Sequence, residues 1–228
     1  MYLLNKNRKK GIKYSMKCPN CDNTNFYKLK DDYIKCKKCT KKYSLKKLEK
    51  DRLIKTAFCE NKTALELSKE MGVNYRTIKD RYDEYRYNIA KFLEDEYNNT
   101  IKDYNEYEEY YYFNQRQKNK KIKSLYEAIN IMGFYSNGKV YTLLMPKLIN
   151  RKESNNENFE QYLNWHKIHS KESYKTNLYR FWLFLEENLK KYKGIKEEHF
   201  FYYLKECEFR FNYSKDEQIQ ILLTHIKI

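Results

Sequence analysis

The stretch CPNCDNTNFYKLKDDYIKCKKC, residues 18–39, decides how the first part of this chain folds. It contains two Cys-x-x-Cys pairs separated by 14 residues. Each pair can form a tight turn that presents two sulfurs to one metal ion, and the 14 residues allow a hairpin that brings the pairs together. Because four thiolates close a tetrahedral site, we predict a structural zinc ion held by Cys18, Cys21, Cys36 and Cys39.

The hairpin between the two pairs has little apolar material, and its expected inward side chains are Phe26, Leu29, Tyr33 and Ile34. A module this small cannot bury enough apolar surface to fold alone, so we expect the metal to supply its folding free energy. Disulfides are the alternative use of the cysteines. The chain shows neither a signal peptide nor a membrane span, which predicts a cytoplasmic protein in which disulfides are disfavoured.

Positive charge is concentrated at the same end of the chain. The net charge is +16, and residues 1–50 carry 16 Lys or Arg against four acids. A local basic block of this kind is typical of proteins that bind polyanions, although a solvated lysine-rich tail is the alternative. A zinc ribbon can bind proteins as well as DNA. The lysines expected to contact phosphates flank the second cysteine pair: Lys37, Lys38, Lys41 and Lys42.

The stretch TALELSKEMGVNYRTIKDRYDEYR, residues 63–86, predicts a helix-turn-helix. Gly72 stands where the first of its helices should end in a left-handed residue, and Asn74 is a good N-cap for the next. Apolar residues have the spacing that locks two helices across a short turn: Leu67, Met71, Val73 and Ile78. The segment before it predicts a supporting helix with four inward side chains: Leu48, Leu53, Ile54 and Phe58.

The second helix of this motif is the expected reader of DNA, because its N-terminal half enters the major groove in such motifs. Arg76 and Lys79 can reach base edges or phosphates, and Thr77 can reach a phosphate. The alternative is an ordinary helical hairpin. The complete set of expected DNA-binding side chains on this helix is Tyr75, Arg76, Thr77, Lys79 and Asp80.

The rest of the chain predicts a small antiparallel sheet packed by helices. Two apolar runs flank Ser136-Asn137-Gly138, which is a hairpin turn. The expected strands are 106–113, 126–135 and 139–145, and the expected helices are 177–193 and 197–212. The predicted fold class is therefore multidomain α+β, with a zinc ribbon in residues 1–47, a helix-turn-helix in 48–97 and a sheet with C-terminal helices in 98–228.

The order of these segments resembles that of zinc-ribbon transposases of bacterial insertion sequences, whose core domain has a ribonuclease-H-like fold with a DDE set of catalytic acids. The similarity runs from about Cys18 to Asn212. Its most specific pieces are the cysteine spacing, the hairpin in GFYSNGKVYTLLMP, and YLKECEFRFN near the C-terminus. The resemblance implies that the N-terminal modules recognise transposon ends in double-stranded DNA. It also implies a core domain that cuts and joins DNA with two divalent metals, and a homo-oligomer.

The acids that this resemblance requires are incomplete. The first belongs on the first core strand, where NEYEEYYYF, residues 105–113, offers Glu108 in place of Asp. No aspartate occurs in residues 105–214, and the 30 residues 147–176 are short for the strands that would carry the second acid. Tyr179 occupies the slot of the third. A glutamate also places its oxygen differently from an aspartate by more than a two-metal site tolerates.

We therefore predict a DNA-binding protein of transposase type with a reduced, inactive ribonuclease-H-like domain. Its first core strand, residues 105–113, is expected to be a structural strand of the sheet, and the carboxylates of that strand are expected to have no catalytic role. Mg²⁺ is expected only if that domain is active. Two alternatives stay open: an active DDE-type transposase that uses Glu108, and a non-enzymatic transcription regulator. Other residues whose roles the sequence leaves open are Glu186, Glu187, His166, His169, and the two remaining cysteines, expected to be buried thiols, Cys59 and Cys207.

Overall fold

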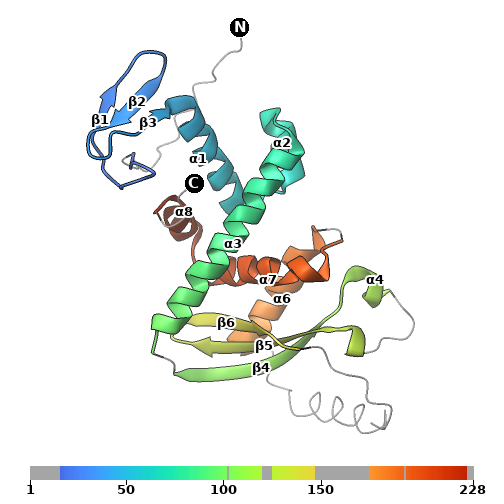
Figure 1. Cartoon of the computed structure of the whole chain (residues 1–228). Coiled ribbons are helices and arrows are strands. Elements are labelled where there is room, and N and C mark those ends of the chain that lie inside the picture. Colours follow the sequence, from blue (N-terminus) through green and yellow to red (C-terminus); the bar gives the residue numbers. More distant parts are fainter. Residues whose placement is uncertain (1–15, 102, 120–124, 147–174, 193, 225–228) are drawn as a thin grey trace, which may run out of the picture. The chain divides into compact units, whose positions relative to one another are not determined.

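The computed structural model describes residues 16–101, 103–119, 125–146, 175–192 and 194–224 (Figure 1). The chain forms two compact units that divide inside one helix. Among the described residues, the first holds residues 16–55 and the second holds those from residue 56 onward. The predicted division into three domains at residues 47 and 97 stays a prediction. No helix in the described ranges is both long and apolar enough to cross a membrane.

The first unit contains a three-stranded antiparallel sheet of short strands, β1 Phe26–Lys28, β2 Tyr33–Cys36 and β3 Lys42–Ser44, in the order β1-β2-β3. The predicted hairpin between the two cysteine pairs is therefore confirmed, since β1 pairs with β2 in the antiparallel sense and Phe26 lies opposite Cys36. Ile34 is buried as expected, but Leu29 and Tyr33 are exposed. The prediction for Tyr33 was wrong because side chains alternate along a strand, and Tyr33 lies on the face opposite Ile34.

Three helices follow, α1 Leu45–Cys59, α2 Ala64–Met71 and α3 Tyr75–Asn99. The predicted signals at the turn between α2 and α3 are confirmed. Gly72 ends α2 in the left-handed conformation with φ 62°, and the Asn74 side chain accepts a hydrogen bond from the backbone N–H of Arg76 at 2.8 Å. At its start, α2 has a capping box in which Thr63 and Glu66 bond each other's backbone N–H.

The inner faces of these helices meet through aromatic rings. Phe58 of α1 makes edge-on contacts with Tyr82 and Tyr85 of α3, with ring centroids 4.9 and 5.5 Å apart. Leu67 and Ile78 are buried, as the sequence predicted. Leu53 is 54% exposed, so its expected inward position was wrong. It precedes Ile54, which takes the buried position at that turn of the helix.

The C-terminal sheet is an antiparallel meander, β4 Tyr104–Tyr112, β5 Ile129–Ser136 and β6 Lys139–Leu144, in the order β4-β5-β6. The predicted turn between β5 and β6 is confirmed: Asn137 and Gly138 have φ values of 52° and 80°, and Ser136 pairs with Lys139. The second strand begins later than predicted because residues 125–127 form a short 3-10 helix, η1 Leu125–Glu127. The short helix α4, Gln115–Lys118, follows β4.

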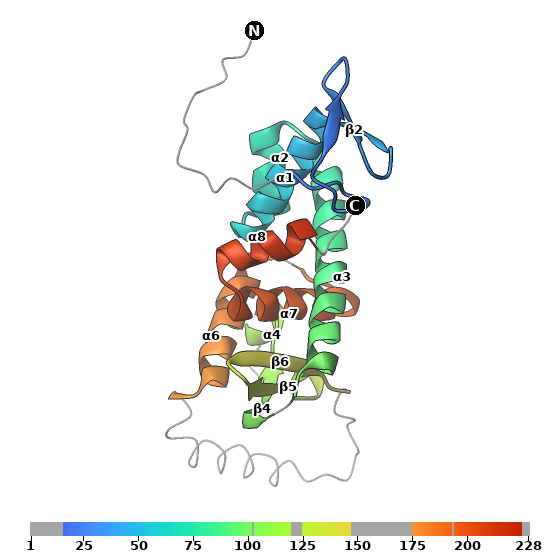
Figure 2. The same ribbon diagram turned by 90° about the vertical axis from the view of Figure 1, so that its left-hand side faces the viewer.

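Two helices, α6 Asn177–Lys190 and α7 Glu197–Asn212, pack on one face of this sheet (Figure 1, Figure 2). The bounds of α7 match the prediction, and α6 stops three residues early. A further helix, α8 Lys215–Thr224, follows α7. Glycine is required at position 133, because a Cβ there would lie 2.6 Å from the Trp182 ring of α6. That ring also stacks on Tyr110 of β4 with centroids 4.6 Å apart.

Candidate metal centre and nucleic-acid interface

The four cysteines sit on two turns that have the same backbone pattern. In the first, the N–H of Cys18 donates to the Asn23 carbonyl and the N–H of Asp22 donates to the Cys18 carbonyl. In the second, the N–H of Cys36 donates to the Lys41 carbonyl and the N–H of Thr40 donates to the Cys36 carbonyl. The residue directly after each pair, Asp22 or Thr40, adopts a left-handed conformation with φ near 60°. This repeat turns each Cys-x-x-Cys pair back on itself, so that both sulfurs face one point.

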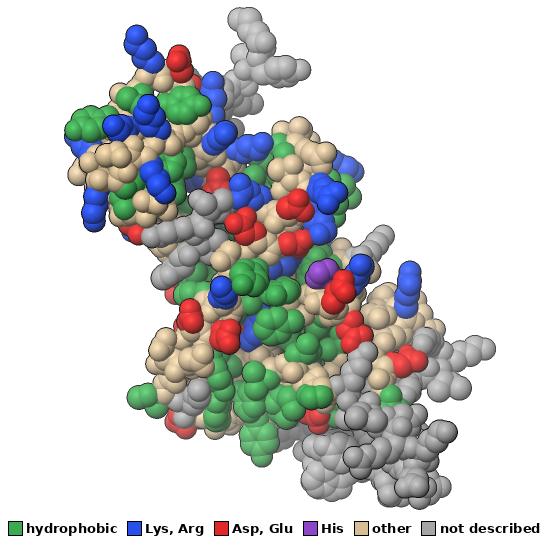
Figure 3. Space-filling model, viewed as in Figure 1, with side chains coloured by type: hydrophobic (Ala, Val, Ile, Leu, Met, Phe, Trp, Pro, Cys, Tyr) green, Lys and Arg blue, Asp and Glu red, His purple; other side chains and the backbone are tan. Residues whose placement is uncertain are grey.

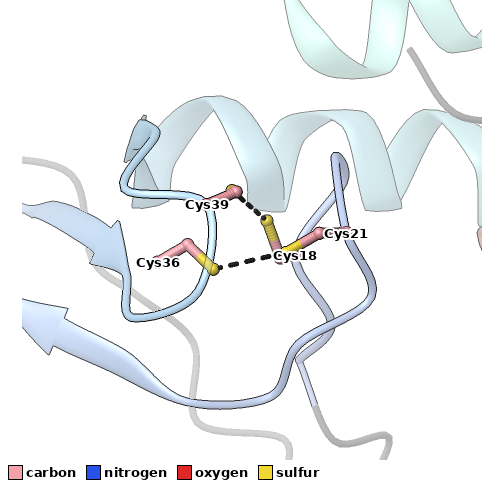
Figure 4. A group of neighbouring side chains, drawn as sticks. All are labelled: Cys18, Cys21, Cys36 and Cys39. Atoms are coloured by element: carbon pink, nitrogen blue, oxygen red, sulfur yellow. Dashed lines mark hydrogen bonds between the residues drawn. The ribbon is translucent and has the colours of Figure 1, made fainter.

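The sulfurs that these turns present lie at the spacing of a tetrahedral zinc site (Figure 4). All four lie within 4.8 Å of one another, with 3.5 Å between the Sγ atoms of Cys18 and Cys39 and 3.6 Å between those of Cys21 and Cys36. Zn–S bonds of about 2.3 Å in a tetrahedron place sulfurs about 3.8 Å apart. Cys18 and Cys36 are fully buried, so a metal here would be largely shielded from water. The four cysteines can therefore hold a metal ion such as zinc.

The close packing of these thiols gives them different pKa values. Burial raises the pKa of Cys36, but hydrogen bonds from the Cys39 backbone and the Asn23 side chain outweigh it and bring the pKa to about 6. A backbone hydrogen bond from Asn23 lowers the pKa of Cys21, but burial and the neighbouring sulfurs raise it to about 11. Four thiolates this close repel one another, and a divalent cation at their centre would allow all four to ionise.

Two polar side chains that were not predicted from the sequence support the cysteines. The Asn23 amide donates to the sulfur of Cys36 at 3.4 Å, and the Tyr43 hydroxyl lies 3.5 Å from the sulfur of Cys18. Groups that hydrogen-bond metal ligands orient them and tune their charge. Asn23 falls two residues after the first pair and Tyr43 four residues after the second. No known spacing rule in the sequence signals either of them.

The four predicted phosphate-binding lysines all lie on the ribbon and are exposed to solvent. Lys37 lies over the Tyr27 ring at 5.0 Å, and Lys41 donates to the Asn20 side chain at 2.5 Å. Lys38 lies inside the second cysteine turn, and Lys42 begins β3. Figure 3 shows lysine and arginine side chains gathered over the ribbon, with few acids among them. This surface has the charge that an anionic partner requires.

On the helix-turn-helix, the five predicted DNA-binding side chains of α3 are also exposed, while Ile78 between them is buried. The Arg76 guanidinium has no ion-pair partner within the described part of the chain. The Lys79 ammonium lies 2.6 Å from the Asp83 carboxylate, and this hydrogen bond raises the pKa of Lys79. The first turns of α3 therefore present a polar surface of mixed charge. On this surface the Arg76 guanidinium can bind an external anion, whereas the Lys79 ammonium is already paired with Asp83.

Two carboxylates of β4 are engaged in holding α6, and the third, Glu109, accepts a hydrogen bond from the Asn130 side chain of β5 at 2.6 Å. Glu106 accepts hydrogen bonds from the backbone N–H groups of Asn177 and Leu178 at 3.2 and 3.0 Å and so caps the N-terminus of α6. Glu108 accepts one from the Trp182 indole N–H at 3.0 Å. Glu106 was not predicted as a site residue, although it stands two residues before Glu108 and so on the same face of the strand. An open hollow of about 340 Å³ borders this pair.

The other residues considered for catalysis do not join Glu108. Tyr179, in the slot of the third acid, is a half-buried residue of α6. Glu186 accepts a hydrogen bond from the Tyr110 hydroxyl at 2.7 Å and pairs with Lys118. His166 and His169 lie outside the described residues. Among the residues that the structure describes, the four cysteines form the one cluster of three or more potential metal ligands. Cys59 and Cys207 are buried thiols, as predicted, and burial raises their pKa to about 12.

Comparison with curated proteins gives a match to an "Uncharacterized transposase-like protein" of Haemophilus influenzae, which is 43% identical over 65 residues. The match covers 27% of this chain and 53% of that protein, so the chain spans about half the length of the curated relative it matches. No family model matches the chain. No solved structure matches it.

Proposed function

We propose that this chain is a DNA-binding protein related to transposases, which recognises double-stranded DNA through its ribbon and its helix-turn-helix. The exposed first turns of α3 carry this proposal. There Arg76 faces solvent at the start of a helix that is correctly capped by Asn74 and set on α2 by the Gly72 turn. A helix of this kind places its N-terminal residues against base edges in the major groove.

The ribbon contributes charge to the same function. Its exposed lysines, Lys37, Lys38, Lys41 and Lys42, would contact phosphates, which position a protein on a duplex without reading its sequence. A zinc ion on the four cysteines would be structural, because four thiolates leave no open position for a substrate. Binding should therefore weaken steeply as salt is raised.

The similarity to a transposase-like protein supports a more specific target, the ends of a transposon. Under this proposal the C-terminal sheet is a reduced ribonuclease-H-like domain without catalytic activity. The support comes from β4, where Glu106 and Glu108 are bonded to α6, and from Tyr179 in the slot of the third acid. A metal site would have to recruit these carboxylates away from the groups that they now hold.

An active DDE-type transposase is the second candidate, and the open hollow beside Glu106 and Glu108 favours it. Strand cleavage of candidate transposon ends with Mg²⁺ or Mn²⁺ decides between the two. We expect no cleavage by the parent protein. Cleavage that is lost in Glu108→Ala would establish the active enzyme instead. Specific binding to promoter DNA, with no binding to inverted repeats that flank the gene, would indicate a transcription regulator.

Replacement of Arg76 by alanine is expected to weaken binding to a preferred duplex by roughly 5- to 150-fold and to relax sequence preference. Lys38→Ala should weaken binding to all duplexes alike and reduce the slope of log affinity against log salt by about 1. Fluorescence anisotropy titrations at several salt concentrations measure both effects. Lys190→Ala, which removes an exposed charge from α6, is the matched control. Equal losses in Arg76→Ala and Lys190→Ala would contradict the role of α3.

A further inference from the structure

Helix α7 carries two buried glutamates, Glu206 and Glu208, that hold different parts of the molecule. Glu206 is 1% exposed and Glu208 is fully buried. They stand two residues apart, so they point to different sides of the helix. Their partners therefore reveal what each side of α7 is attached to.

Glu206 is bonded to two arginines. One carboxylate oxygen accepts from Nε of Arg86 in α3 at 2.6 Å, and the other accepts from Nη2 and Nε of Arg210 at 2.7 and 2.9 Å. The Tyr192 hydroxyl also donates to it at 3.1 Å. Arg86 lies over the Tyr203 ring at 4.1 Å. Burial raises the pKa of Glu206, but Arg86 and Arg210 outweigh it and hold the pKa at about 2, so the group is ionised at neutral pH.

The two arginines extend this contact into the helix-turn-helix. Arg210 donates to the Phe58 carbonyl at 2.7 Å and so adds a second hydrogen bond to a backbone group at the C-terminus of α1, which also accepts from the N–H of Asn61. Arg86 is also bonded to Asp83 at 2.9 Å, and Asp83 in turn holds Lys79 of the exposed DNA-binding face. A chain of alternating charges, Lys79, Asp83, Arg86 and Glu206, therefore connects the surface of α3 to the buried side of α7.

Glu208 connects α7 to the C-terminal sheet. It accepts hydrogen bonds from the backbone N–H of Thr142 at 2.9 Å and from the Lys205 ammonium at 2.8 Å. Lys205 also donates to the Thr142 carbonyl at 2.8 Å. Glu208 and Lys205 therefore cover the outer edge of β6, and Glu206 is the glutamate of α7 that reaches the DNA-binding helices.

We propose that Glu206 is a positioning residue that fixes α3 and the end of α1 on α7, so that the helix-turn-helix and the C-terminal sheet open as one cooperative unit. Further contacts continue along α3: Phe92 meets the rings of Phe209 and Tyr213, and the Tyr97 ring meets Tyr141 of β6 at 5.2 Å. The DNA-binding face is then not an independent module. Its orientation relative to the sheet is set by a buried ion pair.

Hydrogen exchange of the full chain tests this proposal. In the parent, amides of residues 78–90 and of β5 should exchange through the same opening, with the same dependence on denaturant. Glu206→Gln should uncouple the two, so that residues 78–90 open before β5 and exchange on the order of a hundredfold faster than in the parent, because it removes the negative charge that two buried guanidinium groups share. Glu208→Gln, the matched control on the same helix, should act first on β6. Glu206→Asp should restore part of the protection.

Residues 78–90 that open alone in the parent, with the sheet still closed, would overturn the proposal even if Glu206→Gln fails to fold. So would equal effects of Glu206→Gln and Glu208→Gln on α3. The link to DNA rests on the proposed function and is measured separately. At a temperature where both variants are folded, Glu206→Gln should lose about tenfold more duplex affinity than Glu208→Gln. If the parent binds no duplex, the proposed function fails, and the exchange result still decides the coupling.

Discussion

Removing the metal from the four cysteines is expected to unfold residues 16–44 while α2, α3 and the C-terminal sheet stay folded. Apart from Cys18 and Cys36, the one buried hydrophobic side chain in residues 16–44 is Ile34. Burying this one side chain cannot offset the conformational entropy that is lost when the segment becomes ordered. Structural zinc contributes about 10–16 kcal/mol in small modules of this kind, so the metal decides whether the ribbon folds.

Metal analysis and hydrogen exchange check this prediction. The parent should contain one zinc ion per chain, and Cys36→Ser should lose the metal together with the protection of β1, β2 and β3. Cys59→Ser is the control, because Cys59 is also buried but lies outside the cluster, and it should keep the zinc. Ribbon amides that stay protected in metal-free protein would show that the sheet folds without an ion.

Replacing Trp182 by alanine is expected to destabilise the second unit by about 3–5 kcal/mol. The indole lies against the backbone at Gly133, stacks on Tyr110 and donates to Glu108, so it joins α6 to two strands. Thermal or denaturant unfolding measures the loss. The control is Leu183→Ala at the next position of α6, which is 55% exposed and should change stability by no more than about 0.5 kcal/mol.

The same contact separates a structural Glu108 from a catalytic one. In Glu108→Gln the amide oxygen can still accept from the indole N–H, so stability should stay within about 1 kcal/mol of the parent. In Glu108→Ala the buried N–H loses its partner, at a cost of about 1–3 kcal/mol. A metal ligand would respond differently, because glutamine lacks the negative charge. If Glu108→Gln is stable but removes a Mg²⁺-dependent cleavage seen in the parent, Glu108 is catalytic.

The local signals in the sequence predicted the cysteine cluster, its hairpin and the turns well. The Cys-x-x-Cys spacing predicted the cluster, Gly72 and Asn74 predicted the turn of the helix-turn-helix, and Asn137 with Gly138 predicted the hairpin. Each of these features depends on a few neighbouring residues. The left-handed conformation at Asp22 and Thr40 was not predicted, because neither residue type requires it.

The roles of Glu108 and Glu206 could not be predicted, because they depend on contacts between distant parts of the chain. Glu108 meets Trp182, 74 residues later, and the pairing also needs the space left by Gly133. Glu206 meets Arg86, 120 residues earlier. The resemblance to transposases singled out Glu108 among the three acids of β4, but nothing in the sequence indicates which group each acid contacts. The structure distinguishes Glu106 as a helix cap and Glu108 as the acceptor for an indole.

The affinity of the full chain for one duplex, measured before and after zinc is removed, tests the central claim most directly. The titration uses a fixed low salt concentration and is repeated after zinc is added back. We expect chelation to weaken binding at least about tenfold, because the ribbon lysines lose their fixed positions on the phosphates, and we expect added zinc to restore it. An affinity that is unchanged by chelation would contradict zinc-dependent DNA recognition.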